Sequence, residues 1–126
     1  MNLRIEFTRR PIVPPPATFA TPEIGACLEF SGLVRELENG RKLTGLFYEA
    51  YEPMARTQLE KIVRELGARH PCEELLLIHR LAFVPVGESS LFIRLASRHR
   101  QAALAMLGDL VDRLKTDVPI WKRPEG

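Results

Sequence analysis

The chain has 126 residues, of which 45% are hydrophobic, 27% charged and 7% aromatic. This is the composition of an ordinary globular domain, and it excludes a disordered, collagen-like or long coiled-coil protein. The net charge of +2 is too small to predict nucleic-acid binding by itself. No apolar run approaches the roughly 20 residues that a membrane-spanning helix needs.

Length and cysteine content set further expectations. A chain of this length predicts one domain, residues 1–126. The N-terminus lacks the apolar stretch of a secretory signal. Cys27 and Cys72 are too few for a disulfide scaffold and do not form a CxxC motif. We therefore expect a protein of a reducing, cytoplasmic compartment that makes no contact with a membrane.

Alternation and turn residues predict mainly β-structure in the first part of the chain. Residues 1–23 should form a short strand, in which residues 3–8 alternate apolar and polar side chains, followed by a proline-rich connector. A second strand is expected over residues 25–34. The polar segment 36–42 contains an Asn-Gly pair, which predicts a mobile hairpin loop, and residues 43–51 should form the returning strand.

Two amphipathic helices are predicted further along. The first begins at Pro53, because proline suits the first position of a helix, and it ends near Gly67 and Pro71. The second begins near His99 and cannot extend past Pro119. The apolar residues at helical spacing, which should face the core, are Ala55, Leu59, Ile62, Val63 and Leu66 in the first helix and Ala103, Met106, Leu107, Leu110, Val111 and Leu114 in the second.

Two strands separate these helices. Residues 74–84 carry apolar side chains on both faces, which predicts a central strand, and residues 91–97 form another after a turn. A polar tail, residues 116–126, follows the second helix, and we expect Trp121 to anchor it against the body. The order β-β-β-α-β-β-α predicts an α+β domain with a mainly antiparallel sheet.

The motifs of common enzyme classes are absent from the sequence. There is no GxxxxGK[ST], GxGxxG, GxSxG or HExxH, so neither a metal nor a nucleotide cofactor is expected. The two cysteines are better explained as inert packing residues than as nucleophiles. No catalytic class follows from motifs of this kind.

What remains is a set of cations at places where the chain changes element. His99 and Arg100 start the last helix, where unpaired N–H groups favour an anion. Lys115 ends that helix, Lys122 lies in the tail, and Arg35 ends the second strand. Taken singly, all five are better explained as solvated surface residues, and a cation at a helix C-terminus is stabilising in itself.

Separate blocks of the sequence resemble, in the same order, those of one known family. The blocks are Phe30-Ser31-Gly32-Leu33-Val34-Arg35, Leu46 to Ala55, Ile78-His79-Arg80 with Val86-Gly87-Glu88, Ser97-Arg98-His99-Arg100, and Leu114 to Arg123, which is the most specific. They span roughly residues 24–123. The family is the large, catalytic subunit of molybdopterin synthase, and several blocks in order weigh more than any single motif.

The resemblance implies a fold, partners and a reaction. The fold would be an α/β-hammerhead, in a homodimer whose two copies each bind a small ubiquitin-like sulfur-carrier subunit. The reaction would convert cyclic pyranopterin monophosphate into the dithiolene molybdopterin. Sulfur would arrive as a thiocarboxylate on the carrier's C-terminal Gly-Gly tail, so two loaded carriers would be consumed per product.

The resemblance also assigns roles to the five cations. By position, Lys115 and Lys122 match the family's two active-site lysines, and Arg35, His99 and Arg100 match its anion-binding residues. The tail, residues 116–126, would form part of the active site. Because the sulfur nucleophile comes on the carrier, the resemblance implies no catalytic cysteine, metal or cofactor in this chain.

Two other interpretations stay open. The first is a non-catalytic relative that still dimerises and docks a ubiquitin-like carrier; the presence of both Lys115 and Lys122 favours the enzyme instead. The second is a small nucleic-acid-binding α+β domain. That class uses exposed aromatic residues and a larger positive charge, which 7% aromatic residues and a charge of +2 do not supply.

Overall fold

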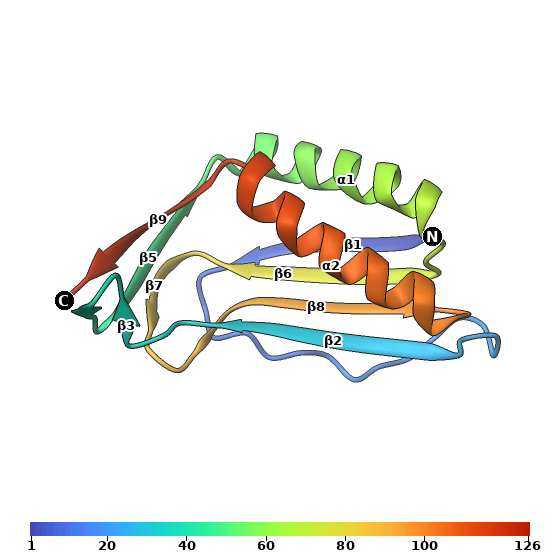
Figure 1. Cartoon of the computed structure of the whole chain (residues 1–126), viewed down its shortest axis with the longest axis horizontal. Coiled ribbons are helices and arrows are strands. Elements are labelled where there is room, and N and C mark those ends of the chain that lie inside the picture. Colours follow the sequence, from blue (N-terminus) through green and yellow to red (C-terminus); the bar gives the residue numbers. More distant parts are fainter.

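The computed structural model describes residues 1–126 and contains two helices and three β-sheets (Figure 1). No helix in it is long and apolar enough to span a membrane. In chain order the elements are β1 (Asn2–Thr8), β2 (Ala26–Leu33), β3 (Leu37–Glu38), β4 (Arg41–Lys42), β5 (Gly45–Ala50), α1 (Glu52–Arg69), β6 (Glu74–Arg80), β7 (Ala82–Pro85), β8 (Ser89–Ser97), α2 (Arg100–Asp117) and β9 (Ile120–Glu125).

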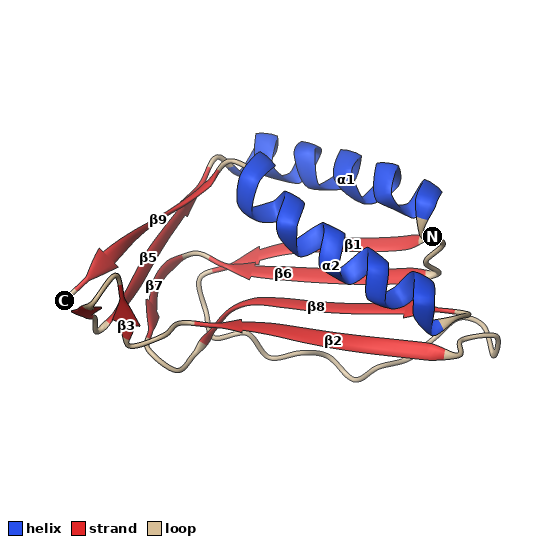
Figure 2. Cartoon of the chain, viewed as in Figure 1, coloured by secondary structure: helices blue, strands red, loops and turns tan.

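The main sheet has four strands in the order β1-β6-β8-β2, and both helices lie on one of its faces (Figure 2). Strand β1 runs parallel to β6, and the other two pairs are antiparallel. The predicted α+β architecture with a mainly antiparallel sheet and two amphipathic helices is confirmed. The parallel pair was not predicted, because β1 and β6 are far apart in the sequence and pairing direction has no local signal.

The main core lies between the helices and this sheet. All five apolar residues predicted to face the core from α1 are at most 1% exposed. Helix α2 buries Ala103, Met106, Leu110 and Leu114, whereas Leu107 and Val111 pack at its edge and are only partly buried. Each fully buried Leu or Ile stabilises the fold by about 1.5–3 kcal/mol relative to an exposed one, so this stripe fixes the helices on the sheet.

A smaller sheet, in the order β7-β5-β9, extends from one end of the main sheet (Figure 1). Its own apolar cluster consists of Val34, Leu43, Leu46 and Val84. Beside it lies the short β3–β4 hairpin, in which Asn39 and Gly40 both have positive φ. This is the conformation that an Asn-Gly turn adopts, so the predicted turn is confirmed.

The prediction of one strand over residues 74–84 was wrong. The segment breaks at Leu81, and its two halves, β6 and β7, belong to different sheets. The Leu81 N–H donates to the Thr8 carbonyl at 2.7 Å, and Ala82 has a φ of +67°, which turns the chain out of the main sheet. Both halves are apolar, so their composition does not mark the break.

The tail differs from expectation, whereas the first helix ends between Gly67 and Pro71 as predicted. Residues 120–125 form β9, which pairs antiparallel with β5. Trp121 is 60% exposed, so it does not anchor the tail; the backbone pairing with β5 holds it instead. Helix α1 continues through Gly67 to Arg69 before Pro71 excludes further helix.

Candidate active site

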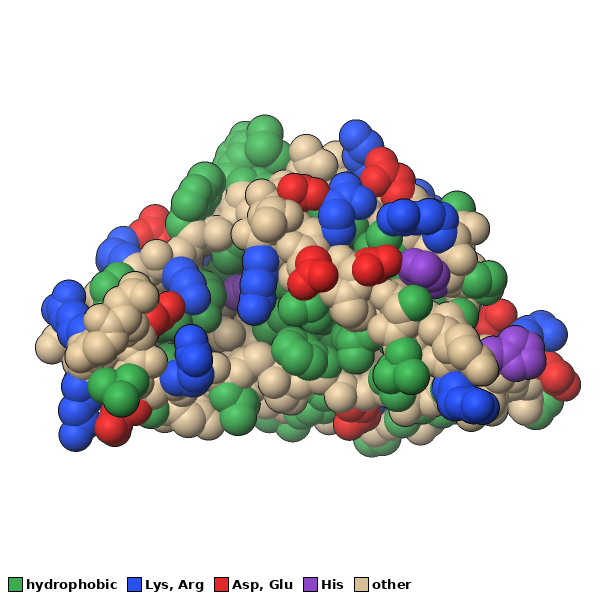
Figure 3. All heavy atoms as spheres, in the orientation of Figure 1, with side chains coloured by type: hydrophobic (Ala, Val, Ile, Leu, Met, Phe, Trp, Pro, Cys, Tyr) green, Lys and Arg blue, Asp and Glu red, His purple; other side chains and the backbone are tan.

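Three of the five predicted cations lie toward the end of the molecule that carries the smaller sheet. Arg35 follows the end of β2, Lys115 lies in the last turn of α2, and Lys122 lies on β9. The end of β2, the end of α2 and β9 all lie in the half of the molecule that carries the smaller sheet (Figure 1). Several Lys and Arg side chains are visible on this part of the surface (Figure 3). We call this region the lysine end.

Lys122 has two defined neighbours. It lies directly opposite Tyr48 of β5, so both side chains stand on the same face of the smaller sheet. Its Nζ lies 3.2 Å from Oε1 of Glu38 on the β3–β4 hairpin, and about half of the Lys122 side chain is exposed. Glu38 was not singled out from the sequence, because only the folded hairpin brings it to β9.

Arg35 and Lys115 are exposed and form no ion pair within the chain. The acid nearest Lys115 in sequence at the end of α2 is already engaged: Arg113 Nε donates to Asp117 at 2.6 Å. That hydrogen bond lowers the pKa of Asp117, with a smaller contribution from Thr116. Asp117 therefore stays ionised and paired with Arg113, which leaves the Lys115 ammonium available to another anion.

His99 and Arg100 lie elsewhere. His99 is the N-cap of α2 and Arg100 its first residue; both are exposed and neither forms an ion pair, whereas Arg98 beside them pairs with Glu73 at 3.3 Å. Arg100 and Lys115 are fifteen positions apart on α2, or about 22 Å at 1.5 Å per residue. One chain therefore does not bring the His99–Arg100 pair to the lysine end.

A buried histidine packs against Tyr48, the cross-strand neighbour of Lys122. His79 is 5% exposed, its Nδ1–H donates to the Arg80 carbonyl at 2.8 Å, and its ring packs edge-on against Tyr48 with centroids 5.2 Å apart. Burial lowers the pKa of His79 from its ordinary value of 6.5, against a smaller opposing effect of the hydrogen bond to Arg80. His79 is therefore a neutral packing residue against Tyr48.

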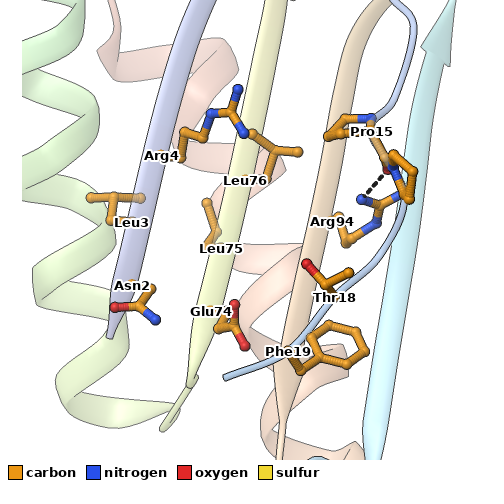
Figure 4. Close-up of a pocket in the computed structure, with 12 residues that line it drawn as sticks. Asn2, Leu3, Arg4, Pro15, Thr18, Phe19, Glu74, Leu75, Leu76 and Arg94 are labelled. Atoms are coloured by element: carbon orange, nitrogen blue, oxygen red, sulfur yellow. Dashed lines mark hydrogen bonds between the residues drawn. The ribbon is translucent and has the colours of Figure 1, made fainter. Parts of the chain in front are cut away.

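None of the five predicted cations lines a cavity of about 320 Å³ (Figure 4). It is enclosed by the proline-rich connector on one side and by β1, β6 and β8 on the other, on the sheet face opposite the helices. Arg94 crosses it to donate to the Pro15 carbonyl at 2.7 Å. This cavity is therefore not the predicted site.

No group of three His, Cys, Asp or Glu side chains is arranged to hold a metal ion. Both cysteines are free thiols, Cys27 exposed and Cys72 buried. Burial raises the pKa of the Cys72 thiol, against smaller effects of its hydrogen bonds to Ala96 and Glu74. The chemistry that the lysine end supports is therefore electrostatic: binding anions and stabilising negative charge.

Comparison with known proteins identifies the family. The family model described as MoaE protein matches residues 9–117. Molybdopterin synthase catalytic subunits are 40% identical over 103 residues in Homo sapiens and 44% identical over 103 residues in Drosophila willistoni, covering 82% and 81% of this chain. The chain spans 55% of the length of the human relative and 28% of the Drosophila one.

Solved structures agree with this assignment. Molybdopterin synthase from Staphylococcus aureus superposes with a TM-score of 0.82 at 30% identity, covering 94% of this chain and 88% of that one. The complex of subunits 1 and 2 of molybdopterin-converting factor from Helicobacter pylori gives a TM-score of 0.69 at 28% identity, covering 81% and 66%. The sequence blocks, the fold and these matches agree: the chain belongs to the MoaE family, that of molybdopterin synthase catalytic subunits.

Proposed function

We propose that this chain is a sulfur-transferring catalytic subunit of molybdopterin synthase. It would take sulfur from the thiocarboxylated C-terminus of a small carrier and pass it to cyclic pyranopterin monophosphate, which forms the dithiolene. The observation that carries this proposal is that the segments carrying Arg35, Lys115 and Lys122 all lie at the lysine end. Family membership supplies the reaction, and these cations suit the anions it handles.

The proposed roles follow from the charge of each reactant. The carrier tail ends in an anionic thiocarboxylate, and Lys115 and Lys122 can stabilise that charge and exchange protons with the reacting groups. The precursor is a phosphate ester, which suits the fork-shaped donors of Arg35 and Arg100 and the ring N–H of His99. The nucleophilic sulfur comes on the carrier, so the chain itself needs no reactive thiol.

A small ubiquitin-like carrier subunit is the proposed protein partner. The Helicobacter pylori structure is a complex of two different subunits, which supports a heteromeric assembly for this family member. The tail of the carrier would reach the lysine end, where two exposed lysines lie close to the smaller sheet.

A homodimer is part of the same proposal. The His99–Arg100 pair lies about 22 Å along α2 from Lys115, too far for one small substrate to bridge within one chain. A second copy that places its helix start beside the lysine end would complete the anion-binding set. A two-fold interface would then create two equivalent sites per dimer.

We further propose that residues 1–126 act as one unit of this family in the cytoplasm. The main apolar cluster runs from Ile5 in β1 to Val118 after α2, so both ends of the chain contribute to one packed body. The tail, residues 116–126, contains β9 and Lys122 and is the proposed wall of the active site.

Incubation of the purified chain with thiocarboxylated carrier and cyclic pyranopterin monophosphate tests the proposed function. We expect dithiolene product, detected after conversion to its fluorescent oxidation derivative, at two carriers consumed per product. A chain that binds the carrier and forms dimers but makes no product would instead be the non-catalytic relative. Carrier lacking the thiocarboxylate serves as the control and should give no product.

A further inference from the structure

Arg80 is a buried arginine, and removing its charge from water costs the fold free energy. Its side chain is only 8% exposed, and its Nη1 donates to Oε1 of Glu88 at 2.7 Å. Its Nε is buried and has no hydrogen-bond partner. Burying a guanidinium with one N–H unpaired is unfavourable, and a well-packed apolar residue would often serve stability as well. Stability alone therefore does not account for Arg80.

The partner of Arg80 closes a turn. Glu88 ends the turn between β7 and β8, and its N–H donates to the Pro85 carbonyl at 3.1 Å. Gly87 in this turn has a φ of +86°, a conformation that side chains other than hydrogen rarely adopt. The ion pair to Arg80 therefore holds the Glu88 end of a turn that already depends on the positive φ of Gly87.

This turn holds the segment that leads to Arg35. The Val34 N–H donates to the Glu88 carbonyl at 3.0 Å, and the Gly87 N–H donates to the Val34 carbonyl at 2.8 Å. Before Val34 the regular pairing of β2 with β8 is interrupted by a register shift between Gly32 and Leu33. The reciprocal bonds to the turn thus replace the sheet ladder immediately before Arg35.

We infer that Arg80 and Glu88 are positioning residues that hold Arg35 in place for the phosphate of the substrate, an inference that rests on the proposed function. Arg80 fixes the Glu88 carboxylate, the Glu88 and Gly87 backbone fixes Val34, and Arg35 follows directly. Arg35 has no ion pair of its own, so its backbone anchor is what restricts it. Restricting a binding group before the ligand arrives strengthens binding because less freedom is lost.

The chain offers a matched control for this ion pair. Arg94 Nε donates to Oε2 of Glu29 at 2.6 Å. These two residues lie directly opposite each other on β8 and β2, so their side chains stand on the same face of the main sheet. The two pairs have nearly the same exposure: 8% and 45% for Arg80 and Glu88, and 12% and 49% for Arg94 and Glu29. Glu29 lies within β2, where regular pairing with β8 is intact, so its loss should not move Arg35.

The test compares Glu88→Gln with Glu29→Gln by equilibrium titration with the precursor and by steady-state turnover. Glu88→Gln should raise the dissociation constant and the KM by roughly 5-fold or more, while kcat changes less than about 2-fold. Glu29→Gln should leave both binding constants at their wild-type values. In an Arg35→Ala background, Glu88→Gln should have no further effect, because the group it positions is gone.

A second variant keeps the test decisive if Glu88→Gln does not fold. Gly87→Ala leaves the ion pair in place, and its Cβ would meet no atom within 4 Å, so it acts only through the backbone of the turn. It should raise the dissociation constant in the same direction. Thermal midpoints of all variants separate this effect from partial unfolding.

Several outcomes would overturn the inference. The inference is wrong if the folded Glu88 or Gly87 variant binds precursor as tightly as the wild type does. It is also wrong if Glu29→Gln and Glu88→Gln weaken precursor binding equally, or if Glu88→Gln keeps its full effect in the Arg35→Ala background. If the wild-type protein binds precursor without forming product, the proposed function fails while the binding comparison still decides this inference. A wild-type protein that does not bind precursor overturns both.

Discussion

Lys122 on β9 and Glu38 on the β3–β4 hairpin form an ion pair, with Nζ 3.2 Å from Oε1. About half of the Lys122 side chain and a quarter of the Glu38 side chain are exposed. Ion pairs of this kind contribute only about 0–1 kcal/mol to stability. Glu38 therefore gives one of the two proposed catalytic lysines a carboxylate partner that an incoming anion can displace.

Removing the Glu38 charge should help the carrier to bind. We expect Glu38→Gln to tighten binding of the carrier tail by up to about 5-fold, because the tail no longer competes with an internal carboxylate. The free energy of unfolding should change by less than about 1 kcal/mol. Glu36→Gln is the control, since Glu36 lies near the same hairpin but pairs with Lys42 at 3.7 Å. Weaker carrier binding in Glu38→Gln would show that Glu38 supports the docking surface instead.

Lys115→Ala should nearly abolish sulfur transfer and leave the fold almost intact. An exposed cation at a helix C-terminus contributes only about 0.3–1 kcal/mol to stability, whereas a positioned electrostatic or proton-transfer group contributes about 100-fold or more in rate. Lys115→Arg keeps the charge at the helix end but cannot readily give up a proton, so it should also be badly impaired. Single-turnover product formation and thermal midpoints check both variants. Near-normal turnover in both would remove Lys115 from the catalytic set.

Arg100→Ala should weaken precursor binding and spare carrier binding. The substitution removes a charge-assisted contact worth about 1.5–3 kcal/mol, so the precursor KM should rise by at least about 10-fold. The two affinities are measured by separate titrations of the same variant. If carrier affinity fell while precursor binding stayed normal, Arg100 would belong to the protein interface.

His79 should make the fold less stable in mild acid. The folded state holds His79 neutral because burial lowers its pKa, whereas the unfolded chain protonates it near the ordinary value of 6.5. Its contribution to stability is therefore present above pH 6.5 and is lost as the pH falls below that value. Urea unfolding between about pH 5 and 8 should show this decline, and His79→Asn should reduce it. An unchanged pH dependence in the variant would show that His79 is not responsible.

Local sequence patterns predicted the helices well, because the spacing of apolar residues determines which face of a helix is buried. The stripe from Ala55 to Leu66 faces the core as expected, and the Asn39-Gly40 turn has the backbone that this pair favours. The break at Leu81 was not predictable in this way, since it depends on a hydrogen bond to Thr8 from a distant strand. Strand β9 was missed for the same reason: its partner β5 lies some seventy residues earlier.

The sequence predicted the residues of the candidate site but not how they are arranged in space. The five cations were chosen by position in matching blocks. The sequence also placed Arg100 at the start and Lys115 at the end of one helix, but the blocks do not reveal how Arg35 and Lys122 lie relative to that helix. Nor do they reveal Glu38 beside Lys122 or the turn that holds Val34. These contacts join segments far apart in sequence, so only the folded chain shows them.

The central claim is that a sulfur-transfer site forms from the lysine end of one copy and the His99–Arg100 pair of another. Dimers that contain one Lys115→Ala copy and one Arg100→Ala copy test it most directly, after purification through a different tag on each copy. One site of such a dimer would carry both substitutions and the other neither, so about half of the wild-type activity should return at precursor concentrations below the KM. A mixed dimer no more active than the two single-variant dimers, or a chain that stays monomeric, would contradict the claim.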